Sequence, residues 1–514
     1  MKILFLTPEV APWSKAGGLG DATAALAKAL AMLGHDIRIV TPLYGSVQPL
    51  NQLKDYREHL EVGVKPVDSC RVKTAADINP KIYFLEHPEY YGAPEIYGDR
   101  VDAGARALFL TRAGLDLCLA DEWIPDVVHV HDWTVALAPV LLNTVLRGTP
   151  LGQSASVLTI HNLQHQGLFG TECIDLLGLP QWLLSPDNLE CLGGINLLKG
   201  GIFHATRLTT VSPTYAKEIL TPEFGFGLDP VIRHRAADLE GILNGVDADD
   251  WNPARDTLIP ARYQATDLTG KALCKTELQR TCGLEKAPST AMIGIVSRMW
   301  DQKGLDLTIE PLRARLRAAE IQLVVLGSGD PAIEAAFLSL AAEFPQRAYV
   351  RIGYDNQLAH RIEAASDFFL MPSRFEPCGL NQLYSMTYGT LPIVRKTGGL
   401  ADTVDGWHQG DAKSTGIVFE HADSTGVQWA LGHAIKLYYQ HENEFHAVRH
   451  RAMSRSFSWT TAAQNYERCY EEAIRQRRHA FAQPAVKPAT SPKPKVALSK
   501  KKAVASKVLK KKSS

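Results

Sequence analysis

Short apolar runs recur along the chain, and between them the apolar residues are spaced three or four apart. Six runs lie in the first half, at residues 2–6, 36–40, 81–85, 127–130, 157–160 and 208–211. Six more follow after a break, at residues 292–296, 321–326, 348–353, 367–371, 391–394 and 416–419. Runs that are apolar throughout and alternate with helical patterns are typical of parallel sheets covered by helices. The pattern therefore predicts an α/β protein with two doubly wound, Rossmann-like domains.

The break between the two series predicts the domain boundary. Residues 244–253 (NGVDADDWNP) interrupt the pattern, and a helical stretch resumes at about residue 268. We therefore expect a first domain over residues 1–250 and a second over residues 251–483, whose last helix, at about 460–480, could pack back on the first domain. Ligands of open α/β sheets bind beyond the carboxyl ends of the strands, so two such domains would hold a substrate in the cleft between them.

Basic and acidic residues are balanced over the whole chain but not in its last 30 residues. The chain of 514 residues has 55 basic and 55 acidic residues, yet residues 485–514 hold ten lysines and no acidic residue. Residues 484–514 are also rich in Pro, Ala and Ser and have no periodic apolar face, which predicts a disordered basic tail. Such a tail can bind a polyanion through counterion release. A nucleic-acid-binding protein is therefore an alternative, but it leaves the α/β pattern of the first 480 residues unexplained.

Cysteine usage and hydropathy bear on the location of the protein. The eight cysteines are scattered and form no CxxC pair, which is typical of reduced thiols in a cytosolic protein. The chain contains no run of about 20 apolar residues, so we expect no membrane-spanning segment. These features predict a cytoplasmic protein.

A glycine-rich turn follows the first apolar run. In KAGGLGD (residues 15–21) the glycines would let a ligand approach the backbone, and the unpaired amides of the following helix would attract an anion. A dinucleotide fingerprint would need glycine at Thr23, and a P-loop would need Gly-Lys-Ser/Thr, which is absent. The segment KTGGLADTV (residues 396–404) repeats the pattern. A turn duplicated in both halves suggests two similar domains that face one ligand.

Two cations follow the first apolar run of the second half. Arg298 and Lys303 lie five residues apart, where the predicted strand at 292–296 ends. Arginine can make paired hydrogen bonds to a phosphate, and lysine acts as a point charge beside it. The two residues therefore suit a diphosphate, and the alternative is that both are solvated surface residues.

Several motifs occur together in a fixed order. They are KAGGLGD (15–21), HDW (131–133), TIHNLQHQG (159–167), EFGFGLDP (223–230), NGVD (244–247) and SRFEPCGLNQLYSMTYGTLPIVRKTGGLADTV (373–404). From residue 1 to about residue 480, the chain closely resembles bacterial glycogen synthase and plant-type starch synthase. The resemblance implies the GT-B fold, in which two Rossmann-like domains face each other across a cleft. It also implies retaining transfer of glucose from ADP-glucose to the non-reducing end of an α-1,4-glucan (glycogen), without a cofactor.

The resemblance assigns binding roles to residues that match the motifs. It implies that Lys15, Gly18 and Asp21 face the donor from the first domain, and that Arg298 and Lys303 hold its phosphates. Because negative charge grows on the departing ADP, cations are needed there during the reaction.

Further roles concern the sugar and the base. By the resemblance, Tyr354 would stack on adenine, His161 would lie beside the transferred glucose, and Glu376 would lie near the reacting centre. Asn244 would line the cleft, and the amides around Cys378–Gly379 would lie beside the sugar. His131 and Trp133, in the HDW motif, either belong to the core or border the cleft.

A double displacement is not favoured by these residues. It needs a second carboxylate as acid and base, and the position eight residues after Glu376, where many related transferases have glutamate, is Tyr384. We expect front-face attack by the acceptor hydroxyl, with the donor phosphate taking its proton. We also expect neither Lys303 nor Glu376 to belong to a core.

Three alternatives differ from this interpretation in the metal, the donor or the activity. Residues 247–250 (DADD) resemble the Asp-x-Asp metal motif of other glycosyltransferases, but they lie in a boundary turn and cations already supply the countercharge, so we expect no metal site. A glucan synthase that uses UDP-glucose, and a non-catalytic relative that binds a glucan or polyanion, remain alternatives.

Overall fold

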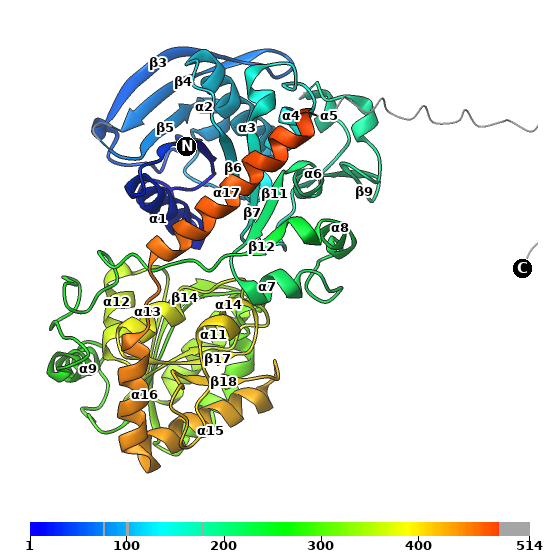
Figure 1. The fold of residues 1–514 in the computed structure, drawn as a ribbon. Helices are drawn as coiled ribbons and strands as arrows, with labels where there is room; N and C mark the ends of the chain where they lie inside the picture. The colour runs from blue at the N-terminus through cyan, green and yellow to red at the C-terminus, as the bar shows by residue number, and fades with distance from the viewer. Residues whose placement is uncertain (76–77, 99–101, 177, 483–514) are drawn as a thin grey trace, which may run out of the picture.

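The first half of the chain builds a nine-stranded sheet, here called the first sheet (Figure 1). The computed structural model describes residues 1–75, 78–98, 102–176 and 178–482, so the predicted tail at 484–514 lies outside the described residues. In spatial order the strands are β12 (Leu239–Gly241), β11 (Arg207–Thr210), β7 (Ala155–Ile160), β6 (Val127–His131), β1 (Lys2–Leu6), β2 (Asp36–Pro42), β5 (Lys81–Glu86), β4 (Asp68–Ala75) and β3 (Leu53–Val62). The six predicted strands form one continuous parallel block, from β11 to β5.

The hairpin of β3 and β4 at one edge was not predicted. These strands pair in antiparallel fashion with each other, and β4 pairs in antiparallel fashion with β5. Of the ten residues of β3, only Leu60 and Val62 are buried, so the strand shows no apolar run. A polar edge strand of this kind also resists pairing with other chains.

Eight α-helices and a small sheet complete the described part of the first half. The helices are α1 (Gly18–Met32), α2 (Pro88–Tyr91), α3 (Ala103–Ala120), α4 (Ala138–Asn143), α5 (Cys173–Leu176), α6 (Leu197–His204), α7 (Pro213–Glu218) and α8 (Asp229–His234). A three-stranded sheet contains β8 (Leu168–Phe169), β10 (Gly194–Asn196) and β9 (Glu190–Cys191).

The second half builds a six-stranded sheet, here called the second sheet, in which every pairing is parallel. All six predicted strands are present, in the order β15 (Ala348–Ile352), β14 (Ile321–Gly329), β13 (Ala291–Met299), β16 (Phe368–Met371), β17 (Leu391–Arg395) and β18 (Ile417–Phe419). The helices are α9 (Thr269–Thr281), α10 (Ile309–Arg317), α11 (Pro331–Glu343), α12 (Asn356–Ala365), α13 (Asn381–Thr387), α14 (Gly398–Thr403), α15 (Ser424–Gln440) and α16 (Glu442–Ser454). The α/β fold with parallel sheets is thus confirmed.

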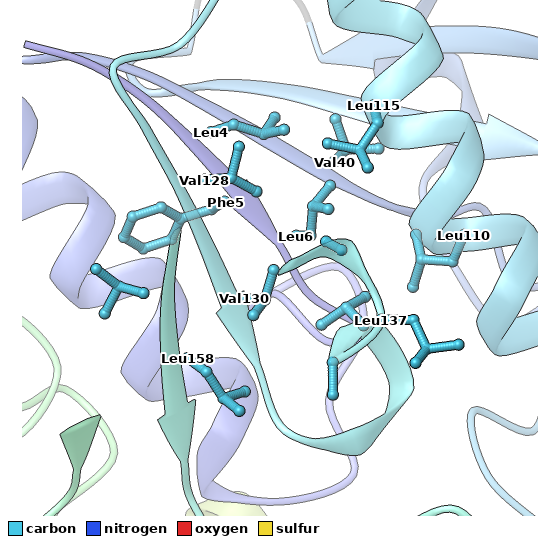
Figure 2. Packing of buried hydrophobic residues seen from close by; sticks show 14 of the residues in the cluster. Leu4, Phe5, Leu6, Val40, Leu110, Leu115, Val128, Val130, Leu137 and Leu158 are labelled. Atoms are coloured by element: carbon cyan, nitrogen blue, oxygen red, sulfur yellow. The ribbon is translucent and has the colours of Figure 1, made fainter. Parts of the chain in front are cut away.

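The core of the first half explains why its central strands are apolar on both faces. Leu4 and Leu6 of β1 are fully buried and lie among side chains of the neighbouring strands, with Val128 paired to Leu4 and Val130 to Leu6 (Figure 2). Leu115 of α3 covers this group. Phe5, on the opposite face of β1, is also fully buried. Burying each such side chain contributes roughly 1.5–3 kcal/mol, so continuous apolar runs are what this position in a sheet favours.

The last helix, α17 (Trp459–Ala482), returns to the first half of the chain. The two segments that connect the halves run side by side, because the amide of Val246 donates to the carbonyl of Phe457 at 2.7 Å. From there α17 lies across the first sheet (Figure 1), and its Tyr466 and Tyr470 are buried in that core. In the described part of the chain, no helix combines the length and apolar character needed to cross a bilayer.

Candidate functional site

The first glycine turn opens helix α1, which starts at Gly18 rather than after the glycines. The amides of Ala16 and Gly17 donate to Glu9 Oε2, at 2.7 and 3.0 Å. A carboxylate of the chain itself therefore holds the turn. Sequence reasoning did not single out Glu9, although it lies just beyond the carboxyl end of β1, where ligands of such sheets bind.

The second glycine turn is held by a glutamate from the other half of the chain. Glu218, the last residue of α7, accepts from the Gly398 amide and the Thr397 hydroxyl, both at 3.0 Å. Gly398 has φ of 43°, and a Cβ there would lie 2.0 Å from the carbonyl oxygen of Glu376. Glycine is therefore required at this point for close packing. The second turn therefore packs against the loop that contains Glu376. The Gly398 amide already has a hydrogen-bond partner, Glu218.

Lys15 and Asp21 form an ion pair of 2.8 Å at the start of α1. Burial raises the pKa of Asp21, and the charge of Lys15 opposes that rise. Gly18 lies between them in sequence and faces the other half, because a Cβ on Gly18 would be 3.3 Å from Leu380. These three predicted residues are thus brought together where the two halves meet.

Lys303 and Glu376 form a short ion pair, with 2.6 Å between Lys303 Nζ and Glu376 Oε2. Gly304 has φ of 62°, and a Cβ there would lie 2.3 Å from the carbonyl oxygen of Pro372, so the loop after β13 packs closely on the loop after β16. The Ser373 hydroxyl donates to the same Glu376 oxygen at 2.9 Å. Glu376 is only 5% exposed, so the expectation that it lies outside a core was wrong. The loop that carries Glu376 packs against the loop that carries Lys303 and against the second glycine turn.

Arg298 is exposed near the carboxyl end of β13. Its guanidinium group makes no hydrogen bond or ion pair with any described residue, although its backbone pairs with β14 and its carbonyl accepts from the Ser297 hydroxyl. Burial lowers the pKa of His165, and the positive charge of Arg298 lowers it further, so the two side chains are close. Because Arg298 has no anionic partner within the described chain, its five donors are available to a ligand.

His161 follows strand β7 and is held at its backbone and at its ring. Its amide donates to Asp132 Oδ1 at 2.6 Å, and its Nε2 lies 3.0 Å from Nδ1 of His131. Burial lowers the pKa of His161 to about 3 and raises the pKa of Asp132 to about 7. Asp132 has φ of 61°, which is rare for a residue other than glycine and is common at functional sites. Its position directly after β6 was the sequence signal that could have identified it.

Cys378 and Asn244 are in contact, as the backbone N–H of Asn244 donates to the Cys378 thiol. Burial raises the pKa of Cys378 to about 12, so this thiol is protonated at neutral pH and unsuited to nucleophilic attack. Gly379 follows directly and precedes α13. Ser212, from the first half, donates to the carbonyl of Pro377 at 2.6 Å. This segment therefore lies at the contact between the halves.

Tyr354 stands apart from the other predicted residues. It follows β15, two strands from β13, and is 79% exposed. Its only hydrogen bond to the described chain is a long one of 3.4 Å to Asn356 Oδ1. An exposed ring of this kind has a free face for stacking, but the structure does not bring it into contact with Arg298 or Lys303.

Tyr384 and the DADD segment have structural partners. The ring of Tyr384 stacks on Trp251, with centroids 4.0 Å apart and planes at 1°. Asp249 pairs with Lys28 at 3.2 Å and with Arg255 at 3.3 Å. Across the described ranges, no group of three or more His, Cys, Asp and Glu side chains has the arrangement of a metal site.

A cavity of about 790 Å³ lies at the opposite ends of the second sheet's strands. Thr290, Glu320 and Asp367, which line it, immediately precede three of those strands. Its buried carboxylate is paired, since Asp367 contacts Lys275 at 2.6 Å and Arg449 at 3.0 Å. Because it lies away from the residues described above, we assign this cavity no part in the site.

Comparisons with known proteins cover almost the whole chain. Residues 2–234 match the family described as starch synthase catalytic domain, and residues 290–436 match glycosyl transferases group 1. The chain is 45% identical over 479 residues to a glycogen synthase of Anaeromyxobacter sp. (strain Fw109-5), covering 91% of this chain and 99% of that protein. It is 43% identical over 486 residues to a glycogen synthase of Myxococcus xanthus, covering 92% and 100%.

Two solved structures resemble the fold. The catalytic domain of starch synthase IV from Arabidopsis thaliana, bound to ADP and acarbose, has a TM-score of 0.85 and 33% sequence identity, covering 92% of this chain and 99% of that chain. A sucrose-phosphate synthase from Thermosynechococcus elongatus has a TM-score of 0.58 at 16% identity, covering 94% and 99%, which is a likeness of fold alone.

Proposed function

Because the chain belongs to the glycogen synthase and starch synthase family of glycosyltransferases, we propose that it transfers glucose from ADP-glucose to the non-reducing end of an α-1,4-glucan, with retention of configuration. Its fold is GT-B, as the resemblance predicted. The solved starch synthase IV domain is bound to ADP and acarbose, which supports a nucleoside diphosphate and a glucan as ligands here.

The observation that carries this proposal is the pair of cations at the carboxyl edge of the second sheet. Arg298 has no anionic partner in the described chain, and Lys303 is held 2.6 Å from Glu376. In the proposed complex both cations contact the donor phosphates, where negative charge grows as the glucose–phosphate bond breaks. Lys15 and Asp21, near the start of α1, face the same donor.

The remaining predicted residues bind the sugar and the base. We propose that His161 lies beside the transferred glucose, together with the amides of Cys378–Gly379. Asn244, whose backbone contacts Cys378, would line the same surface. Tyr354, exposed and free to stack, would cover the adenine. No metal or cofactor is required for these contacts.

Glu376 is proposed to stabilise the positive charge that develops on the sugar, and not to act as a nucleophile. A double displacement requires a second carboxylate about 5 Å away as acid and base. The position eight residues later is Tyr384, whose ring is stacked on Trp251. The protonated thiol of Cys378 is no alternative nucleophile.

The reaction then proceeds on one face of the glucose. The bond between the anomeric carbon and the phosphate oxygen breaks, and the electron pair leaves with ADP. The acceptor hydroxyl oxygen forms the new bond to the anomeric carbon from the same face. Its proton passes to the departing phosphate oxygen, so charge and atoms balance without a protein base. This pathway needs only groups that hold charge and exclude water.

We also propose a cytoplasmic location. All eight cysteines are free, and six of them are buried. Free cysteines are typical of proteins in a reducing compartment, so such a compartment suits the chain.

Glucan elongation measured separately with ADP-glucose and with UDP-glucose tests the proposal. We expect faster transfer from ADP-glucose, and a strong loss of turnover in Glu376→Gln. Lys286→Ala changes an exposed lysine of the same half and serves as the control. Preferential use of UDP-glucose would overturn the donor assignment, and failure to elongate with either donor would overturn the activity.

A further inference from the structure

Three histidines form a connected series from the core of the first half to the proposed sugar site. His129 and His131 alternate with Val130 on β6, so their rings lie on the same face and are 4.1 Å apart. His131 Nδ1 lies 3.0 Å from Nε2 of His161. Burial holds the pKa of His129 and of His131 well below its usual range and lowers the pKa of His161 to about 3. Each ring is therefore neutral at neutral pH and carries a single N–H.

The surroundings of His131 favour one position for its proton. Its Nε2 is buried and has no hydrogen-bond partner, and the ring packs against Phe5 with centroids 5.1 Å apart. A proton on Nε2 would be a buried donor without an acceptor, and such orphaned donors are rarer in proteins than under-satisfied acceptors. The proton therefore belongs on Nδ1, from which His131 donates to Nε2 of His161. The tautomer of a histidine is set by the hydrogen bond that its other nitrogen makes, so His161 carries its own proton on Nδ1.

His129, which packs against His131, is itself held in place by hydrogen bonds. His129 is held at both nitrogens, by the Tyr470 hydroxyl at 2.8 Å and the Thr159 hydroxyl at 2.6 Å. Tyr470 comes from α17, so the C-terminal helix helps to fix the ring against which His131 packs. The backbone of His161 is held by Asp132, whose carboxylate accepts from the His161 amide.

We infer that His131 is a positioning residue that holds His161 as its Nδ1–H tautomer, so that His161 offers the substrate a hydrogen-bond donor rather than an acceptor. This inference rests on the proposed function, which puts His161 beside the transferred glucose. His161 Nδ1 makes no hydrogen bond with any described residue and is not among the buried unpaired atoms, so it is open to a ligand. A donor oriented in advance can bind a sugar oxygen without reorganising during the reaction.

Nitrogen NMR on the full chain labelled with ¹⁵N-histidine tests the tautomer directly. Protonated and unprotonated nitrogens of neutral imidazole give separate signals, and the signals of His161 are identified by their loss in His161→Gln. We expect the proton of His161 on Nδ1 in the wild-type protein. A proton on Nε2 would overturn the inference. Because this measurement needs no turnover, it decides the tautomer even if transfer from ADP-glucose is not observed.

Kinetics of two matched variants test the effect on the reaction. Asn and Leu have nearly the same shape, and the amide nitrogen of Asn can take the place of Nδ1. His131→Leu should lower kcat on the order of tenfold, which is about 1.4 kcal/mol of barrier and the strength of one hydrogen bond. His131→Asn should recover most of that loss, with a thermal transition similar to that of His131→Leu.

His204→Leu is the control for removing a half-buried histidine. The His204 ring contacts Asn143 through Nδ1 and Asn188 through Nε2, outside the proposed site, so its loss should change stability but not kcat. Equal losses of kcat in His131→Asn and His131→Leu would show that only packing matters, and would overturn the positioning role. An unchanged kcat in His131→Leu would do the same. If His131→Leu does not fold, the wild-type NMR result still decides the tautomer, and a proton on Nε2 of His161 would overturn the inference.

Discussion

The ion pair between Lys303 and Glu376 predicts that stability and catalysis are coupled at one contact. The two side chains are 19% and 7% exposed, and their charged atoms are 2.6 Å apart. Lys303→Ala would leave the buried carboxylate with the Ser373 hydroxyl as its remaining side-chain partner in the described chain. Removing one member of a buried pair costs about 3–5 kcal/mol. Since Lys303 is partly solvated, we expect the lower end, about 3 kcal/mol.

A change of this size is measurable by calorimetry. For a unit of 150–250 residues, each kcal/mol shifts the midpoint by roughly 2–4 °C, so Lys303→Ala should lower the transition of the second half by about 6–12 °C. Glu376→Gln keeps the shape of the side chain and removes its charge. In that background Lys303→Ala should cost much less, so the double-mutant cycle should give a coupling energy of about 2 kcal/mol or more.

The same variants separate binding from chemistry. If Lys303 meets the growing phosphate charge, Lys303→Ala should lower kcat on the order of 10²-fold, about 3 kcal/mol of barrier. Glu376→Gln should also depress kcat while leaving ADP binding nearly intact, since it acts at the sugar. Lys286→Ala, at an exposed lysine, is the control. A coupling energy below about 0.5 kcal/mol would refute the stability argument, and an unchanged kcat with a raised donor KM would refute the catalytic one.

Three further results are expected. Burial raises the pKa of Glu363 from 4.5 to about 8, so between these pH values it is neutral when folded and ionised when unfolded. The free energy of unfolding should therefore fall by up to about 1.4 kcal/mol per pH unit as the pH rises through this window, and urea titrations of Glu363→Gln should lack this slope; the same slope in both proteins would contradict the assignment. Tyr470→Phe removes the hydroxyl that contacts His129 at 2.8 Å and should lower the free energy of unfolding by about 1–2 kcal/mol in urea, whereas no change would show that this contact is not made in solution. Glucose transfer should be unaffected by excess EDTA, and a loss restored by adding a divalent metal would argue against reaction without a metal.

Local patterning determined the secondary structure of the two sheets. Strands covered by helices on both faces are mainly apolar, so the twelve apolar runs correspond to twelve strands of the two sheets. Helix α17 was likewise evident from its periodicity. The edge strand β3 was not predicted, because most of its residues are exposed and it therefore has no apolar run. Motif resemblance supplied the family, the expected ligands and the residues of the site.

Only the tertiary structure decided which of those residues touch. Lys303 and Glu376 are 73 positions apart, and they meet because β13 and β16 are neighbours in the second sheet, which places the loops after them side by side. The same holds for His131 and His161, which follow from the pairing of β6 with β7. Strand order is a property of how the whole chain packs, since each strand would be equally buried beside several others. The periodicity of α17 showed an apolar face. Where that face is buried was decided by the core of the first half, whose other residues are more than 200 positions away.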